Sequence, residues 1–176
     1  MSENKGPVHR RPDLSLDQQL ALKAAAEQLE SEFAGVIGVE TIEGFLHSSY
    51  DHVTAHASVP NFLPLLAERF ARQQLHALAK VEGKSDGRPT VLFLCTHNAG
   101  RSQMALGFFT HFAGDAAVAW SGGSAPASEV NPAAVAAMAE RGIDIAGEFP
   151  KPWTEEIVRA ADVVVTMGCG DTCPTF

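Results

Sequence analysis

Apolar residues in the first half of the chain recur every three or four positions in three stretches, which predicts three amphipathic helices. The first stretch covers residues 15–35, where Ser15 and Gln18 form the capping-box pattern of a helix start. The second covers residues 41–58, and the third begins at Asn61, a residue type favoured at helix N-termini. The apolar positions that define these stretches are Leu20, Ala24, Leu29, Ile42, Phe45, Leu46, Val53, Phe62, Leu63, Leu66, Phe70, Ala77 and Leu78.

Three such helices joined by short connections predict an antiparallel three-helix bundle over residues 15–83. Residues 1–14 mix glycine, proline and charge without periodicity, so we expect a flexible arm ahead of the bundle. Residues 84–89 are polar and rich in helix breakers, as is typical of a linker. We therefore place a domain boundary at this linker and a second domain over residues 90–176.

The second half of the chain alternates strand and helix patterns. Residues 90–94 form a continuous apolar run, which is typical of a strand covered on both faces of a parallel sheet. Residues 116–120 predict a second strand, and residues 162–167 predict a third that is also buried. This alternation predicts an α/β fold with a doubly wound parallel sheet. The helical patterns between and after these strands cover residues 104–112, 131–141 and 154–160.

Composition narrows the class of protein. The 176 residues include 13 Lys and Arg against 21 Asp and Glu, a net charge of −8, so nothing predicts a basic face for nucleic acid. No apolar run approaches the roughly 18 residues of a membrane span, and the first residues lack a signal-peptide core. The three cysteines, an odd number, suit a reducing compartment. We expect a cytoplasmic protein that binds neither nucleic acid nor membrane.

The candidate chemistry lies at the first strand-to-helix turn, where five residues separate Cys95 from Arg101. Unpaired backbone N–H groups, the helix dipole and the arginine charge all lower a thiol pKa, and the same groups bind a tetrahedral oxyanion. A lone cysteine is more often a buried core residue, but the Cys-x5-Arg-Ser spacing between strand and helix favours a nucleophile. The candidate oxyanion-binding residues are Thr96, His97, Asn98, Ala99, Gly100, Arg101 and Ser102.

The segment VLFLCTHNAGRSQMA resembles the active-site loop of the low-molecular-weight protein tyrosine phosphatase fold, and its RSQMA ending resembles the arsenate reductase branch. Phosphatases of this fold usually carry Pro where this chain has Gln103. The resemblance extends over residues 90–176, and the N-terminal bundle resembles a helical extension of some actinobacterial reductases. Further motifs that carry the resemblance are Ser121–Ser124, Glu129–Pro132, Arg141–Asp144, Lys151–Pro152 and Thr166–Pro174.

This resemblance implies that Cys95 attacks arsenate and that a cysteine relay completes its reduction to arsenite. Cys169 and Cys173 fit the second and third positions of the relay, which thioredoxin would then reduce. An alternative keeps these two thiols as spectators and uses mycothiol and mycoredoxin as external donors. No bound cofactor is implied in either case.

Two departures from the family pattern affect the predicted site, and a metal site is not predicted either. Leu106 stands where many members with the cysteine triad carry a glutamate of a cation site, so we predict no such site. The family's general acid follows in a segment beyond residue 176, so the chain is expected to lack the C-terminal part of the fold. Two cysteines without a second ligand pair do not predict a zinc site, and His52 and His56 are better explained as bundle residues. We therefore predict no metal ligand.

Two rival functions remain open from the sequence. A low-molecular-weight tyrosine phosphatase would use the same nucleophile and arginine, although Gln103 and the additional cysteines argue against it. A non-catalytic anion-binding or regulatory protein would use residues 15–83 as a regulatory or dimerisation module. A homodimer through this bundle is one expectation of that interpretation.

Overall fold

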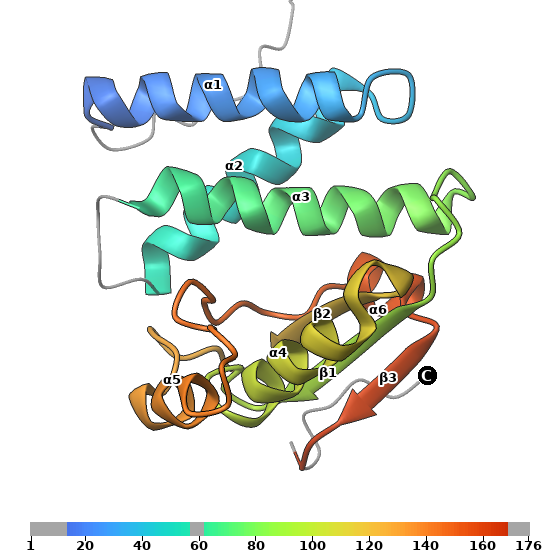
Figure 1. The fold of residues 1–176 in the computed structure, drawn as a ribbon. Helices are drawn as coiled ribbons and strands as arrows, with labels where there is room; N and C mark the ends of the chain where they lie inside the picture. Colours follow the sequence, from blue (N-terminus) through green and yellow to red (C-terminus); the bar gives the residue numbers. More distant parts are fainter. Residues whose placement is uncertain (1–13, 57–61, 169–176) are drawn as a thin grey trace, which may run out of the picture.

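The computed structural model describes residues 14–56 and 62–168 of the chain. Three long helices come first and pack together, and a small parallel sheet with its own helices lies beneath them (Figure 1). The helices are α1 (Leu16–Glu32), α2 (Val39–His56), α3 (Leu63–Val81), α4 (Arg101–Ala113), α5 (Pro132–Ala139) and α6 (Glu155–Ala160). The strands are β1 (Thr90–Cys95), β2 (Val118–Gly123) and β3 (Val163–Thr166), and a short 3₁₀ turn, η2 (Gly114–Ala116), precedes β2.

The start of α1 confirms the predicted capping box. The Ser15 hydroxyl accepts a hydrogen bond from the Gln18 N–H at 3.2 Å, and the Gln18 side chain accepts one from the Ser15 N–H at 3.1 Å. Of the predicted apolar stripe of this helix, Leu29 is fully buried, whereas Leu20 is 58% exposed and Ala24 is also exposed. The buried face is formed by Leu22, Ala25 and Leu29, which are three and four positions apart along the helix.

The start of α3 differs from the expected one. The predicted cap Asn61 lies outside the described residues, and Phe62 precedes the first helical residue without a side-chain cap. Because Phe62 stands ahead of the helix, it does not share the helix's apolar face and is 58% exposed. Pro64 is accommodated in the first turn, where no backbone N–H is needed within the helix.

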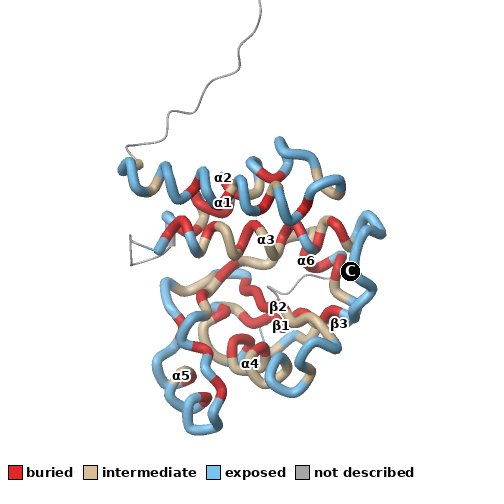
Figure 2. The backbone as a smooth tube through the Cα atoms, turned by 45° about the horizontal axis from the view of Figure 1, so that its top comes forward, coloured by how far each residue is buried: buried red, intermediate tan, exposed pale blue. Residues whose placement is uncertain are grey.

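The first hydrophobic core joins α1, α2 and α3. Buried side chains of the three helices meet along their facing sides, as the red segments of Figure 2 show. The Ser49 hydroxyl donates to the Gln74 side chain at 2.8 Å, which satisfies two buried polar groups between α2 and α3. The buried residues of this core are Leu22, Ala25, Leu29, Phe33, Ile42, Leu46, Tyr50, Val53, Leu63, Ala67, Ala71 and Leu75.

The sheet confirms the predicted parallel α/β architecture, with the strand order β2-β1-β3. In β1, Leu92 and Leu94 are buried in one cluster with residues of α3 and α6. Phe93 faces the other way, and its ring lies 5.7 Å from the ring of Phe109 on α4. The second strand begins at Val118 rather than at residue 116, because residues 114–116 form η2.

The prediction that the third strand is buried was wrong. Val163 is 51% exposed, and none of the four residues of β3 is buried. Among the described strands β3 pairs with β1 alone, so one of its sides is unpaired within the described sheet. The run of valines in β3 led to the prediction of a buried strand. Valine is common in exposed strands as well, so this pattern does not determine burial.

Helix α3 contributes side chains to both cores. Its opposite face places Phe70 and Ala77 in the second core, beside Leu92 and Leu94 of the sheet. The helical and sheet regions are therefore joined by a shared helix, whereas the domain boundary at residues 84–89 stays a prediction.

Within the described residues, no helix is long and apolar enough to cross a membrane.

Candidate active site

Cys95 ends β1 and is buried at the base of the loop that leads into α4. Burial alone would raise the pKa of this thiol. Hydrogen bonds from the Ser102 hydroxyl and from the backbone N–H groups of Ser102, Asn98 and His97 outweigh burial, so the pKa of Cys95 lies below its ordinary value. The structure thus gives Cys95 the surroundings of a thiolate nucleophile.

The Ser102 hydroxyl is oriented toward the sulfur. Its oxygen lies 2.9 Å from the Cys95 Sγ and accepts a hydrogen bond from the Asn98 side-chain amide, also at 2.9 Å. Because the amide can only donate to this oxygen, the hydroxyl hydrogen is left free to donate to a thiolate. Ser102 is fully buried, so water does not compete for this hydrogen bond.

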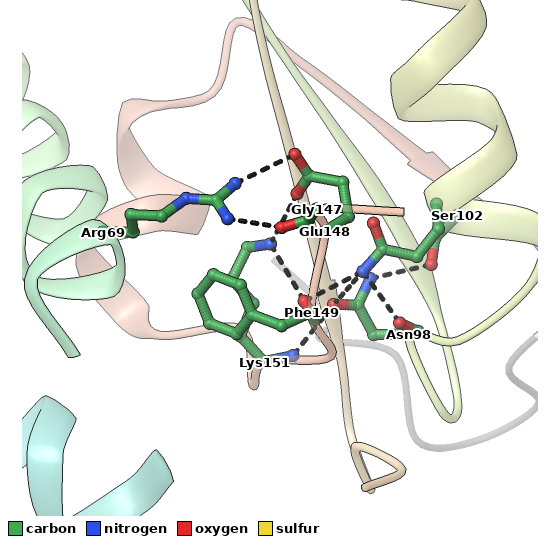
Figure 3. A network of polar contacts seen from close by, with 8 residues as sticks. Arg69, Asn98, Ser102, Gly147, Glu148, Phe149 and Lys151 are labelled. Carbon is green, nitrogen blue, oxygen red and sulfur yellow. Dashed lines mark hydrogen bonds and ion pairs between the residues drawn. The ribbon is translucent and has the colours of Figure 1, made fainter. Parts of the chain in front are cut away.

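Asn98 holds the loop in an unusual shape. Its φ of 46° is the only positive value among the described residues other than glycine, and its side chain is fully buried. The Asn98 Oδ1 accepts hydrogen bonds from the Lys151 backbone N–H at 2.9 Å and from the Gln103 side-chain amide at 3.2 Å (Figure 3). These bonds offset the strain of the left-handed conformation and fix which end of the Asn98 amide faces Ser102.

Gln103 joins the loop to the segment before Lys151. Its side-chain amide donates to the Asn98 carbonyl at 2.9 Å and to the Phe149 carbonyl at 3.0 Å. The sequence alone indicates Gln103 as a mark of the reductase branch and gives no sign of its bond to Phe149. The Lys151–Pro152 motif was a signal for this support, but its contact with residue 98 depends on the fold.

Three backbone carbonyls of the loop accept hydrogen bonds from the segment that follows β2. Thr96, His97 and Ala99 accept hydrogen bonds from the backbone N–H groups of residues 125, 127 and 131, at 2.9, 2.9 and 2.8 Å. With these carbonyls engaged on that side, N–H groups of the loop are directed at the sulfur. Gly100 precedes α4, and its carbonyl accepts the Met104 N–H at 2.9 Å.

Gly123 lets the loop approach β2 closely. A Cβ at this position would lie 2.6 Å from the Thr96 carbonyl oxygen and 3.0 Å from the Asn98 nitrogen. Real Cβ atoms do not come this near to backbone, so a larger residue would displace the loop.

The side chains of His97 and Arg101 are exposed. The His97 ring Nδ1 lies 3.0 Å from the Ala125 carbonyl oxygen, so its backbone N–H rather than its ring points to Cys95. The Arg101 guanidinium packs against Gly168, where a Cβ would lie 2.9 Å from Nη1. The two further predicted catalytic residues, Cys169 and Cys173, lie outside the described residues.

The structure also describes the positions considered for metal binding. Leu106 is buried in α4. Across residues 14–56 and 62–168, no three His, Cys, Asp or Glu side chains gather as potential metal ligands. The described part of the site is therefore a thiol in a loop of hydrogen-bond donors.

The chain matches two known protein families, one in each half. Residues 90–172 match the family described as low molecular weight phosphotyrosine protein phosphatase, and residues 22–79 match the one described as protein-tyrosine-phosphatase-like, N-terminal domain. The fold and the loop around Cys95 thus define a protein of the low-molecular-weight phosphatase class.

Relatives narrow this class further. A thioredoxin-dependent arsenate reductase of Corynebacterium glutamicum has a similar solved structure, with a TM-score of 0.83 and 44% identity over 90% of this chain and 80% of that one. An arsenate reductase of Brevibacillus brevis is 39% identical over 51% of this chain and 68% of its own length. The chain belongs to the arsenate reductase family within the low-molecular-weight phosphatase class.

The match to other curated relatives is partial. The arsenate reductase of Halalkalibacterium halodurans is 43% identical over 49% of this chain, and that of Bacillus subtilis is 44% identical over 48%. The matched regions cover 63% and 61% of those two proteins, so the chain spans less than two thirds of their length.

Proposed function

We propose that this chain reduces arsenate to arsenite, with Cys95 as the nucleophile. The observation that carries the proposal is the Cys95 thiol, whose pKa is lowered by the Ser102 hydroxyl and by three backbone N–H groups despite burial. The same donors suit a tetrahedral oxyanion with its central atom in front of the sulfur. Similarity to a thioredoxin-dependent arsenate reductase over 90% of the chain favours arsenate over phosphate esters.

In the first step, the Cys95 thiolate attacks the arsenic atom of arsenate. A sulfur–arsenic bond forms, and one arsenate oxygen leaves as water after protonation. Residues 96–102 would hold the remaining oxygens through their N–H groups, and Arg101 would add its positive charge. Arsenic is still in its +5 state in this adduct.

In the second step, the Cys169 thiolate attacks the sulfur of Cys95. The sulfur–arsenic bond breaks, its electron pair stays with arsenic, and arsenite in the +3 state leaves. Cys173 then attacks Cys169, which frees Cys95 and leaves a Cys169–Cys173 disulfide. The short spacing of these two residues in the sequence is compatible with the Cα separation that a disulfide requires.

Thioredoxin is the reductant that we propose for this disulfide. The support is the similar structure from Corynebacterium glutamicum, whose protein is described as thioredoxin-dependent. Two electrons pass from thioredoxin to the disulfide, which matches the two electrons that arsenic accepts.

The test is arsenite formation by the purified chain with thioredoxin, its reductase and NADPH. We expect turnover in the unchanged chain and none in the Cys95→Ser, Cys169→Ser or Cys173→Ser variants. Turnover that survives Cys169→Ser would contradict the internal relay, and turnover that requires mycothiol and mycoredoxin would contradict the thioredoxin donor. Cleavage of phosphate esters through Cys95 without any arsenate reduction would identify a phosphatase instead.

A further inference from the structure

The segment of residues 147–151 lies between the helical region and the active-site loop (Figure 3). On the helical side, the Arg69 guanidinium of α3 donates to the Gly147 carbonyl and, at 3.1 Å, to the Glu148 carboxylate. Arg69 and the segment are 78 and 79 positions apart in the sequence, so this contact exists only in the folded chain.

Charge and aromatic packing reinforce the contact. The Arg69 guanidinium carbon lies 5.2 Å from the centre of the Phe149 ring, and the Lys151 ammonium lies 4.6 Å from it. The Glu148 carboxylate is 3.8 Å from the Lys151 ammonium, so it is paired with a cation on either side. Arg69 is therefore bound to the segment by two hydrogen bonds and a cation–π contact.

On the other side, the same segment supports the loop. The Phe149 carbonyl accepts the Gln103 amide at 3.0 Å, and the Lys151 backbone N–H donates to Asn98 Oδ1 at 2.9 Å. Asn98 in turn donates to the Ser102 oxygen, and Ser102 lies 2.9 Å from the Cys95 sulfur. A continuous path of hydrogen bonds and chain segments thus connects α3 with the nucleophile.

We propose that Arg69 is a positioning residue for the Cys95 nucleophile: it fixes segment 147–151, which through Asn98 orients the Ser102 hydroxyl toward the sulfur. This gives helix α3 a role in the reaction in addition to its packing. The inference rests on the proposed function only in taking Cys95 as the nucleophile.

Replacing Arg69 by methionine retains most of its apolar length and removes all its donors. Segment 147–151 then loses its anchor, Asn98 is held less firmly, and the Ser102 hydrogen bond to the thiolate weakens. We expect the pKa of Cys95 to rise by about one unit, which is a roughly tenfold fall in the ratio of thiolate to thiol at a fixed pH below it. The charged groups that face this segment are Glu148 and Lys151, and Arg69 acts on both, so Arg69→Lys, which keeps the charge, separates the loss of charge from the loss of positioning.

The measurement is the ultraviolet absorbance of the thiolate as a function of pH, with the rate of alkylation by iodoacetamide as a second readout. Both are made in the full chain carrying Cys169→Ser and Cys173→Ser, so that Cys95 is the only cysteine left of the three. Arg72→Met is the matched control, because Arg72 lies on the same helix and bonds Glu32 and Glu68 within the helical region.

A shift in Arg69→Met with no shift in Arg72→Met is the expected result. No shift in Arg69→Met, or equal shifts in both variants, would overturn the proposal. If Arg69→Met does not fold, Arg69→Lys takes its place. Lysine keeps the charge but cannot bridge both acceptors, so a smaller shift in the same direction is expected, and an unchanged pKa overturns the positioning role.

Neither readout involves arsenate, so the two proposals can fail separately. A chain that shows the Arg69 shift without reducing arsenate would contradict only the proposed function. A chain that reduces arsenate while Arg69→Met leaves the Cys95 pKa unchanged would contradict only the role of Arg69.

Discussion

Lys80 and Asp162 form an ion pair that ties the end of α3 to the start of β3. The Asp162 carboxylate also accepts a hydrogen bond from the Thr90 backbone N–H at 2.7 Å, at the first residue of β1. These two interactions, first that of Lys80 and then that of Thr90, lower the pKa of Asp162 below 3.8. One carboxylate therefore connects three elements from distant parts of the sequence.

We predict that Asp162→Asn destabilises the chain by less than about 1 kcal/mol at neutral pH, because this carboxylate is half-exposed and screened by water. The contribution of a carboxylate with a lowered pKa is present above its unfolded value and is lost as the pH falls. The difference in free energy of unfolding between the two chains should thus shrink as the pH falls below 3.8. Urea denaturation at several pH values measures this difference, and a difference that grows toward acid would contradict the prediction.

Ser102→Ala removes the largest of the interactions that lower the pKa of Cys95. We expect this pKa to rise by about one unit and alkylation of Cys95 at neutral pH to slow by up to roughly tenfold. Ser121→Ala is the control, since Ser121 is equally buried but its hydroxyl has no hydrogen-bond partner among the described residues. Equal rates in the two variants would show that Ser102 does not set the reactivity of the thiol.

Lys151 is buried, and burial lowers the pKa of its ammonium to about 8 from 10.5, with Glu148 acting in the opposite direction. Between these two values the unfolded chain binds more protons than the folded one. The free energy of unfolding therefore gains up to about 3 kcal/mol from this residue as the pH rises through the window.

Lys151→Met should remove this gain, so that the stability of the original chain improves relative to the variant as the pH rises from 8 to 10.5. Lys23→Met serves as the comparison, because the Lys23 side chain is 75% exposed and its variant should follow the original chain. Denaturant titrations across this pH window provide the test. Parallel curves for the original chain and Lys151→Met would show that the lysine is not held in a low-dielectric site.

Gly123→Ala places a methyl group against the backbone of the active-site loop. We expect a loss of about 1 to 3 kcal/mol in stability together with slower alkylation of Cys95, because the loop must move away from β2. Gly44→Ala, at an exposed position of α2, meets no atom within 4 Å and should stabilise the chain by about 0.5 to 1 kcal/mol. Thermal unfolding should show a lower midpoint temperature for Gly123→Ala and a higher one for Gly44→Ala than for the original chain.

Local signals in the sequence predicted much of the secondary structure. The Ser15 capping box and the helix start at Asn131 and Pro132 each rest on a side chain that accepts a hydrogen bond from an N–H two or three residues away. Such bonds depend on the near sequence alone. Local spacing also predicted where the Cys95 loop lies, between β1 and α4.

Features that depend on distant contacts were not predicted. The exposure of β3 follows from its pairing with β1 alone among the described strands, which no local pattern encodes. The support of Asn98 by Lys151 joins residues 53 positions apart, and the contact of Arg69 with Glu148 joins residues 79 apart. Spacing within a motif predicts Cys95 as the candidate nucleophile, whereas the residues that hold its loop are brought there by tertiary packing.

The sharing of α3 between the two cores has a consequence for the order in which the protein is made. Translation completes α3 before any strand of the sheet has left the ribosome, since α3 ends at Val81 and β1 begins at Thr90. The side chains of Phe70 and Ala77 on α3 are thus available for Leu92 and Leu94 to pack against when β1 emerges. One face of the sheet is covered as it forms, which shortens the time its apolar strands are open to aggregation.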